Sequence, residues 1–326
     1  MNIVVTGATG FIGFNIVRKL IKMGHNVKGI DNLTPSYGSE MAQARYLELQ
    51  KKYGIKVEIH NLLELPLEKL IQKIENSHVV IHLAAWPGVR LSKLYPYTYS
   101  QNNIETFNKT IEAVRVADIP KFLYASSSSV YANLGISGPV SEDDADGKNL
   151  LSYYAGTKWV NERTANQYRL NFGVRSTALR FFTVYGPYGR PDMAYWQFTK
   201  KLLNSEAISL HGKHGGSRCF TFIDDAVSIL TSLIAQECNL SDIESLNISD
   251  GEPRETIELL NNLATHLNIS DFKFQEIERP KDDATSTWAN TSRLNSLIGD
   301  IPKTSLEIGT KEFVTWFQSK DLWRKA

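Results

Sequence analysis

Cysteine is scarce in this sequence: only Cys219 and Cys238 occur among 326 residues. Two cysteines cannot build a disulfide framework, which favours a reducing compartment. The chain has no long run of one charge and a formal net charge of +1, a pattern that argues against nucleic acid or an anionic membrane surface as a partner. No apolar run is long enough to span a bilayer, and the first residues read as a strand rather than as a secretory signal. We therefore expect a cytoplasmic protein.

The length and the 42% hydrophobic content suit one large two-lobed domain or two domains. A short apolar run, Ile3–Val5, reads as a buried strand and leads into glycines at positions 7, 10 and 13. Apolar residues then recur at helical spacing over residues 12–21, and Val27–Ile30 reads as a second strand. Glycines where a strand turns into a helix let the backbone approach a pyrophosphate, whose charge faces the helix N-terminus.

Asp31 ends the second strand, roughly 20 residues after the glycine-rich turn. A carboxylate there can accept hydrogen bonds from both ribose hydroxyls, and it repels a 2′-phosphate. The pattern therefore predicts NAD rather than NADP as the ligand. A tight strand–helix turn that binds nothing is the competing interpretation.

Tyr154 and Lys158 stand four residues apart and lie on one face if their segment is helical. An ammonium beside a phenol favours the phenolate, so we expect the pKa of Tyr154 to fall toward neutrality. Such a tyrosine can take a proton from an alcohol and return it. The spacing alone also fits a tyrosine and a lysine on the surface of an amphipathic helix.

The Gly-x-x-Gly-x-x-Gly spacing resembles that of the short-chain dehydrogenase/reductase superfamily, in its extended branch of NAD-dependent epimerases and dehydratases. Later stretches fit the same branch, among them the apolar strand 79–85 and the Ser-rich stretch 126–129. The resemblance implies an α/β fold with a doubly wound parallel sheet of the Rossmann type and a smaller C-terminal substrate lobe. It also implies cofactor contacts by Gly7, Gly10, Phe11, Ile12, Gly13, Asp31, Asn32, Asn61, Leu62, Leu83, Ala84, Ala85, Asn103, Tyr154 and Lys158.

The family places its catalytic serine or threonine three residues before the valine of a Val-Tyr pair, which here is Ser127. Ser127, Tyr154 and Lys158 thus form the implied catalytic set, in the family's order. The stretch 180–194 resembles the one that marks uronate epimerases within the branch, and Arg190 is a bidentate donor suited to a sugar carboxylate. The implied substrate contacts are Gly88, Arg90, Ser127, Ser128, Thr183, Arg190, Arg218, Arg279 and Asp282. The acidic partner of Arg279 is open between Asp282 and Asp283.

The resemblance implies C4 epimerisation of a nucleotide sugar, most closely UDP-glucuronate to UDP-galacturonate, through a 4-keto intermediate. A UDP-glucuronate decarboxylase, another UDP-sugar 4-epimerase and an NAD-binding sensor or scaffold stay open as alternatives. Trp86 and Trp196 add bulk near the expected site and leave the sugar undecided. No metal site is expected, and family members suggest a homodimer. We expect an NAD-binding domain at 1–180 and 219–249 and a substrate domain at 181–218 and 250–326.

Overall fold

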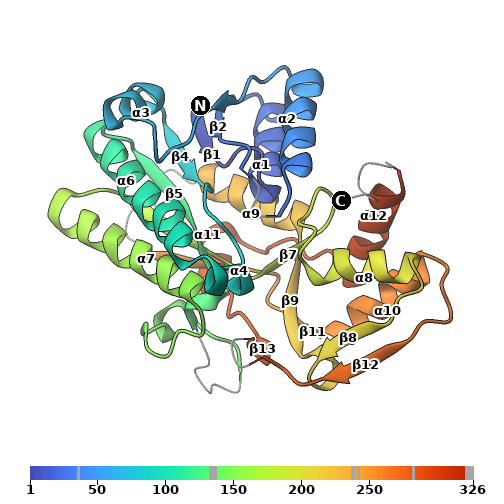
Figure 1. Cartoon of the computed structure of the whole chain (residues 1–326). Helices are drawn as coiled ribbons and strands as arrows, with labels where there is room; N and C mark the ends of the chain where they lie inside the picture. The colour runs from blue at the N-terminus through green and yellow to red at the C-terminus, as the bar shows by residue number, and fades with distance from the viewer. Residues whose placement is uncertain (35–36, 132–137, 236–239, 241–242, 281–282, 320–326) are drawn as a thin grey trace.

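A computed structural model describes residues 1–34, 37–131, 138–235, 240, 243–280 and 283–319. Seven parallel strands form the central sheet, in the order β10-β6-β5-β4-β1-β2-β3 (Figure 1). The order reverses between β1 and β4, as a doubly wound sheet requires, so the predicted fold class is confirmed. The strands are β1 (Asn2–Thr6), β2 (Asn26–Asp31), β3 (Glu58–Ile59), β4 (Val79–His82), β5 (Lys121–Ser127), β6 (Ser176–Phe181) and β10 (Ser245–Ile248).

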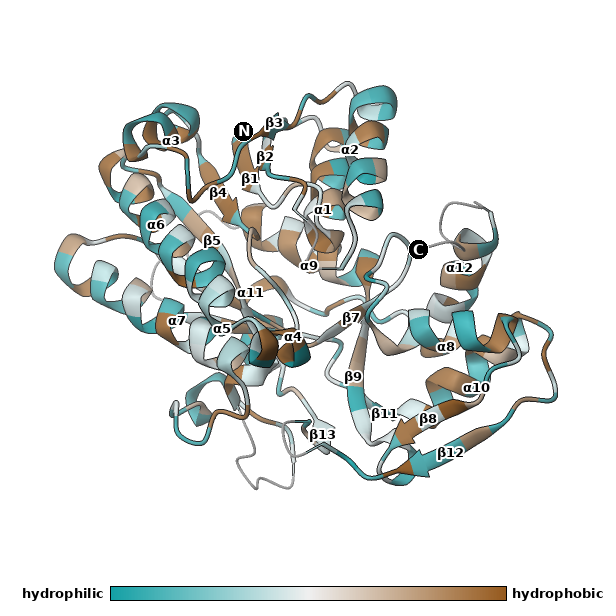
Figure 2. Cartoon of the chain, in the orientation of Figure 1, coloured by the Kyte–Doolittle hydropathy of each residue, from teal (hydrophilic) through white to brown (hydrophobic). Residues whose placement is uncertain are grey.

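Helices cover both faces of this sheet because its strands are apolar on both sides. Along β1, Ile3 and Val5 pack in one core cluster with helix α1, while Val4 belongs to the opposite cluster beneath α3 and α6. Figure 2 shows the strands β1 and β4 in brown between helices whose outer sides are largely teal. The helices of these two layers are α1 (Phe11–Lys22), α2 (Ser39–Tyr53), α3 (Leu67–Ile74), α6 (Thr106–Val116), α7 (Tyr153–Phe172), α9 (Ile223–Ala235) and α11 (Ser292–Ile298).

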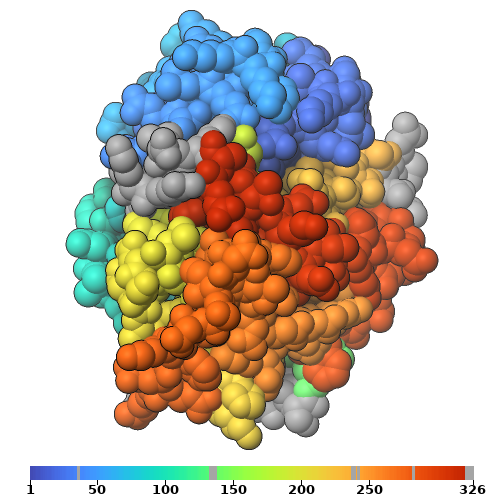
Figure 3. Space-filling model, turned by 90° about the vertical axis from the view of Figure 1, so that its right-hand side faces the viewer, coloured from blue at the N-terminus to red at the C-terminus, as the bar shows by residue number. Residues whose placement is uncertain are grey.

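The smaller lobe is built around a second sheet, in which β9 (Ser217–Phe222) pairs with β7 (Thr183–Tyr185), β11 (Pro253–Glu255) and β13 (Ser286–Thr287). A separate parallel pair joins β8 (Ile208–His211) to β12 (Phe274–Ile277). The helices of this lobe are α8 (Ala194–Leu203), α10 (Thr256–His266) and α12 (Leu306–Gln318). Figure 3 shows the N-terminal residues (blue) at the top of one face and the later segments (orange to red) over much of the rest.

Short helical segments complete the described chain: α4 (Val89–Leu94), α5 (Pro96–Tyr99), the π-helix η1 (Ser100–Glu105), and the 3₁₀ turns η2 (Ser128–Tyr131), η3 (Glu142–Asp144) and η4 (Lys213–Gly215). The chain enters the small lobe after β6, returns with α9 and β10, and then leaves again. The predicted domain division remains a proposal, and the pairing of β9 favours a boundary just before Ile223. Within the described residues, no helix has the length and apolar content to cross a membrane.

Candidate active site

A cavity of about 1310 Å³ lies at the carboxyl ends of the central strands and extends to the small lobe. Ligands of open α/β sheets bind at this edge, near the point where the strand order reverses. Most of the residues that the sequence singled out line it: Gly7, Gly10, Phe11, Ile12, Gly13, Asp31, Asn32, Asn61, Leu62, Leu83, Ala84, Ala85, Gly88, Arg90, Ser127, Ser128, Tyr154, Lys158, Thr183, Arg190 and Arg218.

The glycine-rich turn leaves the N-terminus of α1 open toward the cavity. Gly7 has φ +70°, and a Cβ there would lie 2.7 Å from the amide nitrogen of Ala84, just after β4. At Gly13 a Cβ would lie 1.9 Å from the carbonyl oxygen of Gly7. With any other residue at position 13, α1 could not start so close to the end of β1. No side chain caps α1 and its first turn holds no acid. Free amides at a helix N-terminus suit a pyrophosphate, so these residues fit NAD.

Asp31 lies at the end of β2 and is fixed by the backbone. Its two carboxylate oxygens accept hydrogen bonds from the amides of Thr9 and Leu33, each at 2.9 Å. These bonds hold the carboxylate beside the glycine-rich turn, at the rim of the cavity. The geometry agrees with the ribose-binding role that the sequence predicts.

Ser127, Tyr154 and Lys158 come together from two elements. Ser127 is the last residue of β5, while the other two lie in the first turns of α7, whose N-cap Ser152 accepts a hydrogen bond from the amide of Ala155. The Lys158 ammonium lies 5.9 Å from the centroid of the Tyr154 ring. Lys158 is 3% exposed and Ser127 is 8% exposed, so the surface interpretation of the tyrosine–lysine pair is wrong.

Burial dominates the electrostatics of this pair. It raises the pKa of Tyr154 above the usual 10.0, although the Arg190 charge and a hydrogen bond with Ser127 act in the opposite direction. It lowers the pKa of Lys158 to about 8, partly offset by Glu162. The expectation that Lys158 alone brings the Tyr154 pKa toward neutrality is therefore wrong for the protein by itself, because desolvation of the phenolate outweighs the nearby charge.

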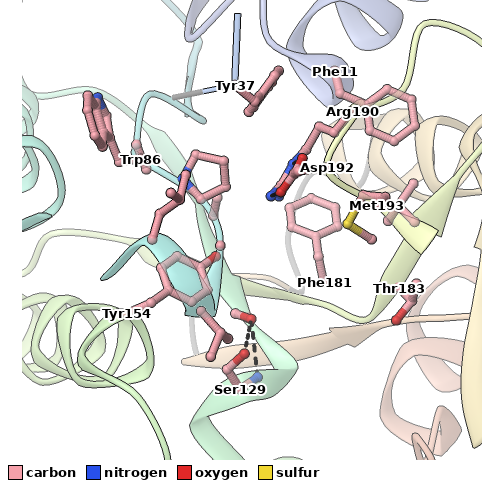
Figure 4. Close-up of a pocket in the computed structure, with 18 of the residues that line it drawn as sticks. Phe11, Tyr37, Trp86, Ser129, Tyr154, Phe181, Thr183, Arg190, Asp192 and Met193 are labelled. Atoms are coloured by element: carbon pink, nitrogen blue, oxygen red, sulfur yellow. Dashed lines mark hydrogen bonds and ion pairs between the residues drawn. The ribbon is translucent and has the colours of Figure 1, made fainter. Parts of the chain in front are cut away.

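Arg190 projects into the same space as Tyr154 (Figure 4). Its guanidinium forms a two-pronged ion pair with Asp192, Nε to Oδ1 at 3.0 Å and Nη2 to Oδ2 at 2.6 Å. The Tyr37 ring lies on it, with 5.3 Å between the ring centroid and the guanidinium carbon. A Cβ on Gly88 would lie 3.4 Å from Nη2, an ordinary contact, so the backbone φ of +103°, and not crowding by the arginine, favours glycine there. Asp192 thus occupies the two-pronged face of the Arg190 guanidinium, in the same cavity as Tyr154.

The polar groups near the expected sugar are small hydroxyls. Thr183 starts β7 and lines the cavity with Ser128. Next to them, the Ser127 hydroxyl donates to the Ser129 hydroxyl and accepts from the Ser129 amide, both at 3.1 Å. This local turn fixes the position of the Ser127 oxygen.

Two arginines of the small lobe share one carboxylate. Arg218 and Arg279 both pair with Asp283, at 2.9 and 3.1 Å. Arg218 lines the cavity, whereas Arg279 lies behind it and donates to the carbonyl of His211. Arg279 is not among the residues that line the cavity, and of the two candidate acidic partners, Asp283 is the one that pairs with it. Asp282 lies outside the described residues.

Two further expectations need correction. Asn103 is 1% exposed and does not reach the cavity; its side chain accepts from the Trp86 amide at 2.7 Å and donates to the Trp86 carbonyl at 3.0 Å. It supports the wall of the site rather than contacting a cofactor. Trp196 is fully buried between α8 and α12 against Phe313 and Phe317, so only Trp86 of the two tryptophans lines the cavity.

A buried ionic network beneath the site went unnoticed in the sequence. Glu162, one turn after Lys158 on α7, pairs with Arg180 of β6 at 2.7 Å and accepts from the hydroxyl of Ser126 at 2.5 Å. Arg180 also donates to the Tyr131 hydroxyl. The network joins α7 to the strand end that carries Ser127. The four-residue spacing of Lys158 and Glu162 was the only local signal for it.

Comparison with known proteins adds independent findings. The family model for the "NAD dependent epimerase/dehydratase family" matches residues 3–249. UDP-glucuronate 4-epimerase 1 of Arabidopsis thaliana is 36% identical, over 98% of this chain and 77% of its own length. The crystal structure of UDP-glucuronic acid 4-epimerase from Bacillus cereus with UDP-glucuronic acid and NAD is 30% identical, with a TM-score of 0.88 over 98% of this chain and 99% of that one.

A second similar structure names a different substrate. The UDP-N-acetylglucosamine 4-epimerase from Methanobrevibacter ruminantium M1, in complex with UDP-N-acetylmuramic acid, is 27% identical. Its TM-score is 0.85, over 98% of each chain. The same fold therefore occurs in proteins named for different sugars. The identity of the sugar has to be inferred from the residues around it and not from the fold.

Proposed function

The chain belongs to the NAD dependent epimerase/dehydratase family, and we propose that it inverts C4 of UDP-glucuronate to give UDP-galacturonate. The observation that carries this proposal is the convergence of Ser127, Tyr154 and Arg190 on one cavity. The first two suit an alcohol that is to lose a proton, and the arginine suits a carboxylate on the same sugar.

NAD, when bound, supplies a hydride acceptor and a positive ring whose charge adds to that of Lys158 and Arg190 beside the phenol. Tyr154 takes the proton of the C4 hydroxyl, and Ser127 orients the oxygen. The Lys158 ammonium, held by a 3.0 Å hydrogen bond to the carbonyl of Ala125, stabilises the phenolate. The 4-keto sugar then turns within the cleft and regains hydrogen on its other face, with Tyr154 returning the proton.

The 4-keto uronate is a β-keto acid and loses carbon dioxide readily when the bond from C5 to the carboxylate aligns with the carbonyl π system. An epimerase must hold the carboxylate out of that alignment. We assign this role to Arg190, with Thr183 and Ser128 as hydrogen-bonding partners. The Arg190–Asp192 ion pair shows that this guanidinium binds a carboxylate in a two-pronged geometry, and the substrate carboxylate has to take the place of Asp192 there.

We also propose that the protein forms a homodimer through α6 and α7. Large apolar side chains are exposed there: Leu170 at 71%, Phe172 at 59% and Val116 at 48%. Exposed apolar side chains near the C-terminal ends of both helices favour a partner surface. Light scattering coupled to size-exclusion chromatography tests the assembly, and the cytoplasmic location stays a prediction.

The test of function is product analysis from the purified protein without added cofactor. A panel of UDP-sugars with and without a C6 carboxylate is incubated and the products are separated by chromatography. UDP-galacturonate from UDP-glucuronate supports the proposal. A UDP-pentose product indicates the decarboxylase, turnover of neutral sugars alone indicates another 4-epimerase, and bound NAD without any turnover indicates a sensor or scaffold.

A further inference from the structure

Arg45 is a fully buried arginine in the wall of the cavity. It stands on α2 and is 1% exposed. Its guanidinium makes four hydrogen bonds to three backbone carbonyls: to Tyr188 from Nε at 3.1 Å and from Nη2 at 2.6 Å, to Gly189 from Nη2 at 2.9 Å, and to Thr9 from Nη1 at 3.1 Å. One side chain thus ties the glycine-rich turn to the segment that immediately precedes Arg190.

The segment held by Arg45 has a strained backbone. Tyr188 has φ 62°. This is the left-handed region of backbone conformation, which residues other than glycine and asparagine rarely adopt. Its hydroxyl donates to the carboxylate of Glu48, with distances of 2.8 and 2.9 Å to the two oxygens, and its ring packs 4.6 Å from that of Phe14. Glu48 lies three residues after Arg45 on the same helix, so α2 holds Tyr188 through both its carbonyl and its hydroxyl.

We propose that Arg45 is a positioning residue for sugar recognition: by clamping Tyr188 in its left-handed conformation it aims Arg190 at the carboxylate of the substrate. This inference rests on the proposed function for the identity of the ligand. A left-handed residue two positions before Arg190 sets the direction in which the chain leaves the turn. Released from Arg45, the backbone relaxes toward its favoured region and carries Arg190 away from Tyr154.

The chemistry of the clamp requires an arginine. Its planar fork reaches two adjacent carbonyls and a third on the opposite side, whereas a lysine ammonium is a compact charge without this geometry. Arg45→Lys therefore keeps the charge and loses the fork, and Arg45→Met loses both.

The experiment measures dissociation constants of UDP-glucuronate and UDP-glucose for the NAD-containing protein by calorimetry. Hydrogen exchange of residues 186–193 is measured in parallel. Arg45→Met is expected to weaken UDP-glucuronate binding about tenfold, the effect of losing one well-placed charged hydrogen bond, and to leave UDP-glucose within about twofold. Arg45→Lys is expected to weaken UDP-glucuronate binding as well, by a smaller factor. Arg163→Met, which removes a half-exposed arginine on α7, is the matched control.

Faster exchange of residues 186–193 in the Arg45 variants, with no change in Arg163→Met, is the second expected result. If Arg45→Met does not fold, Arg45→Lys and Tyr188→Phe carry the test, since the latter removes the hydroxyl that bonds Glu48 and keeps the ring. Equal weakening of both sugars, or unchanged exchange in folded variants, overturns the clamp. If the unaltered protein binds UDP-glucuronate no better than UDP-glucose and does not convert it, the proposed function fails, and the exchange data alone decide the role of Arg45.

Discussion

The ammonium of Lys158 lies 5.9 Å from the centroid of the Tyr154 ring and donates its hydrogen bond to the carbonyl of Ala125. The pair therefore acts through charge across a short distance in a buried site. Burial opposes both charged forms that the chemistry needs, the phenolate and the ammonium. The buried charge therefore lowers the free energy of unfolding, compared with that of a protein with an apolar side chain of the same shape. Unfolding measurements can determine this difference.

Lys158→Met is expected to stabilise the protein at neutral pH. The pKa of Lys158 is about 8 in the folded chain against 10.5 in the unfolded one. The unfolded chain therefore binds more protons between these values, and the stability of the unaltered protein rises over that range. The shift corresponds to roughly 3 kcal/mol.

Urea unfolding of both proteins at several pH values checks this prediction. The advantage of Lys158→Met should be largest below pH 8 and shrink toward zero near pH 10.5. Turnover should be lost in the variant. An advantage that does not depend on pH would show that packing, and not the buried charge, causes the difference.

Arg190→Ala should raise the KM for UDP-glucuronate by about tenfold or more, because a charge-assisted two-pronged contact is lost. A released 4-keto uronate carboxylate also reaches the alignment for decarboxylation, so UDP-pentose should appear among the products. Chromatography of the reaction mixture measures both effects, with Arg163→Ala as the control. Unchanged turnover and an unchanged product ratio would show that Arg190 does not bind the substrate carboxylate.

Asn103→Ala should destabilise the protein by about 2 kcal/mol, because the amide and carbonyl of Trp86 lose their buried partner. Since Asn103 lies behind the cavity wall, NAD affinity at a temperature where the variant is folded should change by less than about threefold. Asn102→Ala is the matched control, because it removes the same type of side chain from the neighbouring position. The Asn102 amide donates to the carbonyl of Thr98, and the residue lines the cavity. A large loss of NAD affinity without loss of stability would show that Asn103 contacts the cofactor after all.

The sequence predicted the parts of the site that depend on local spacing. The glycine-rich turn, Asp31 and the Tyr154–Lys158 pair each lie within a short stretch, so helix and strand periodicity places them. The family resemblance, and not periodicity, predicted that Ser127 and Thr183 lie at the carboxyl edge of the sheet, where both line the cavity with the glycine-rich turn.

The remaining features depend on contacts between distant segments. Arg45 meets carbonyls of residues 188 and 189, and Glu162 meets Arg180 from another element. No local pattern contains these pairs. The pKa of Tyr154 was predicted in the wrong direction because spacing tells which residues share a face but not how deeply that face is buried.

The most direct test of the central claim follows the hydrogen at C4. UDP-glucuronate carrying deuterium at C4 is incubated with the purified protein in ordinary water, without added cofactor, and the product is analysed by mass spectrometry and NMR. The account predicts UDP-galacturonate that retains the deuterium at C4, because hydrogen leaves and returns within the same closed cleft. Loss of the deuterium to solvent would contradict it.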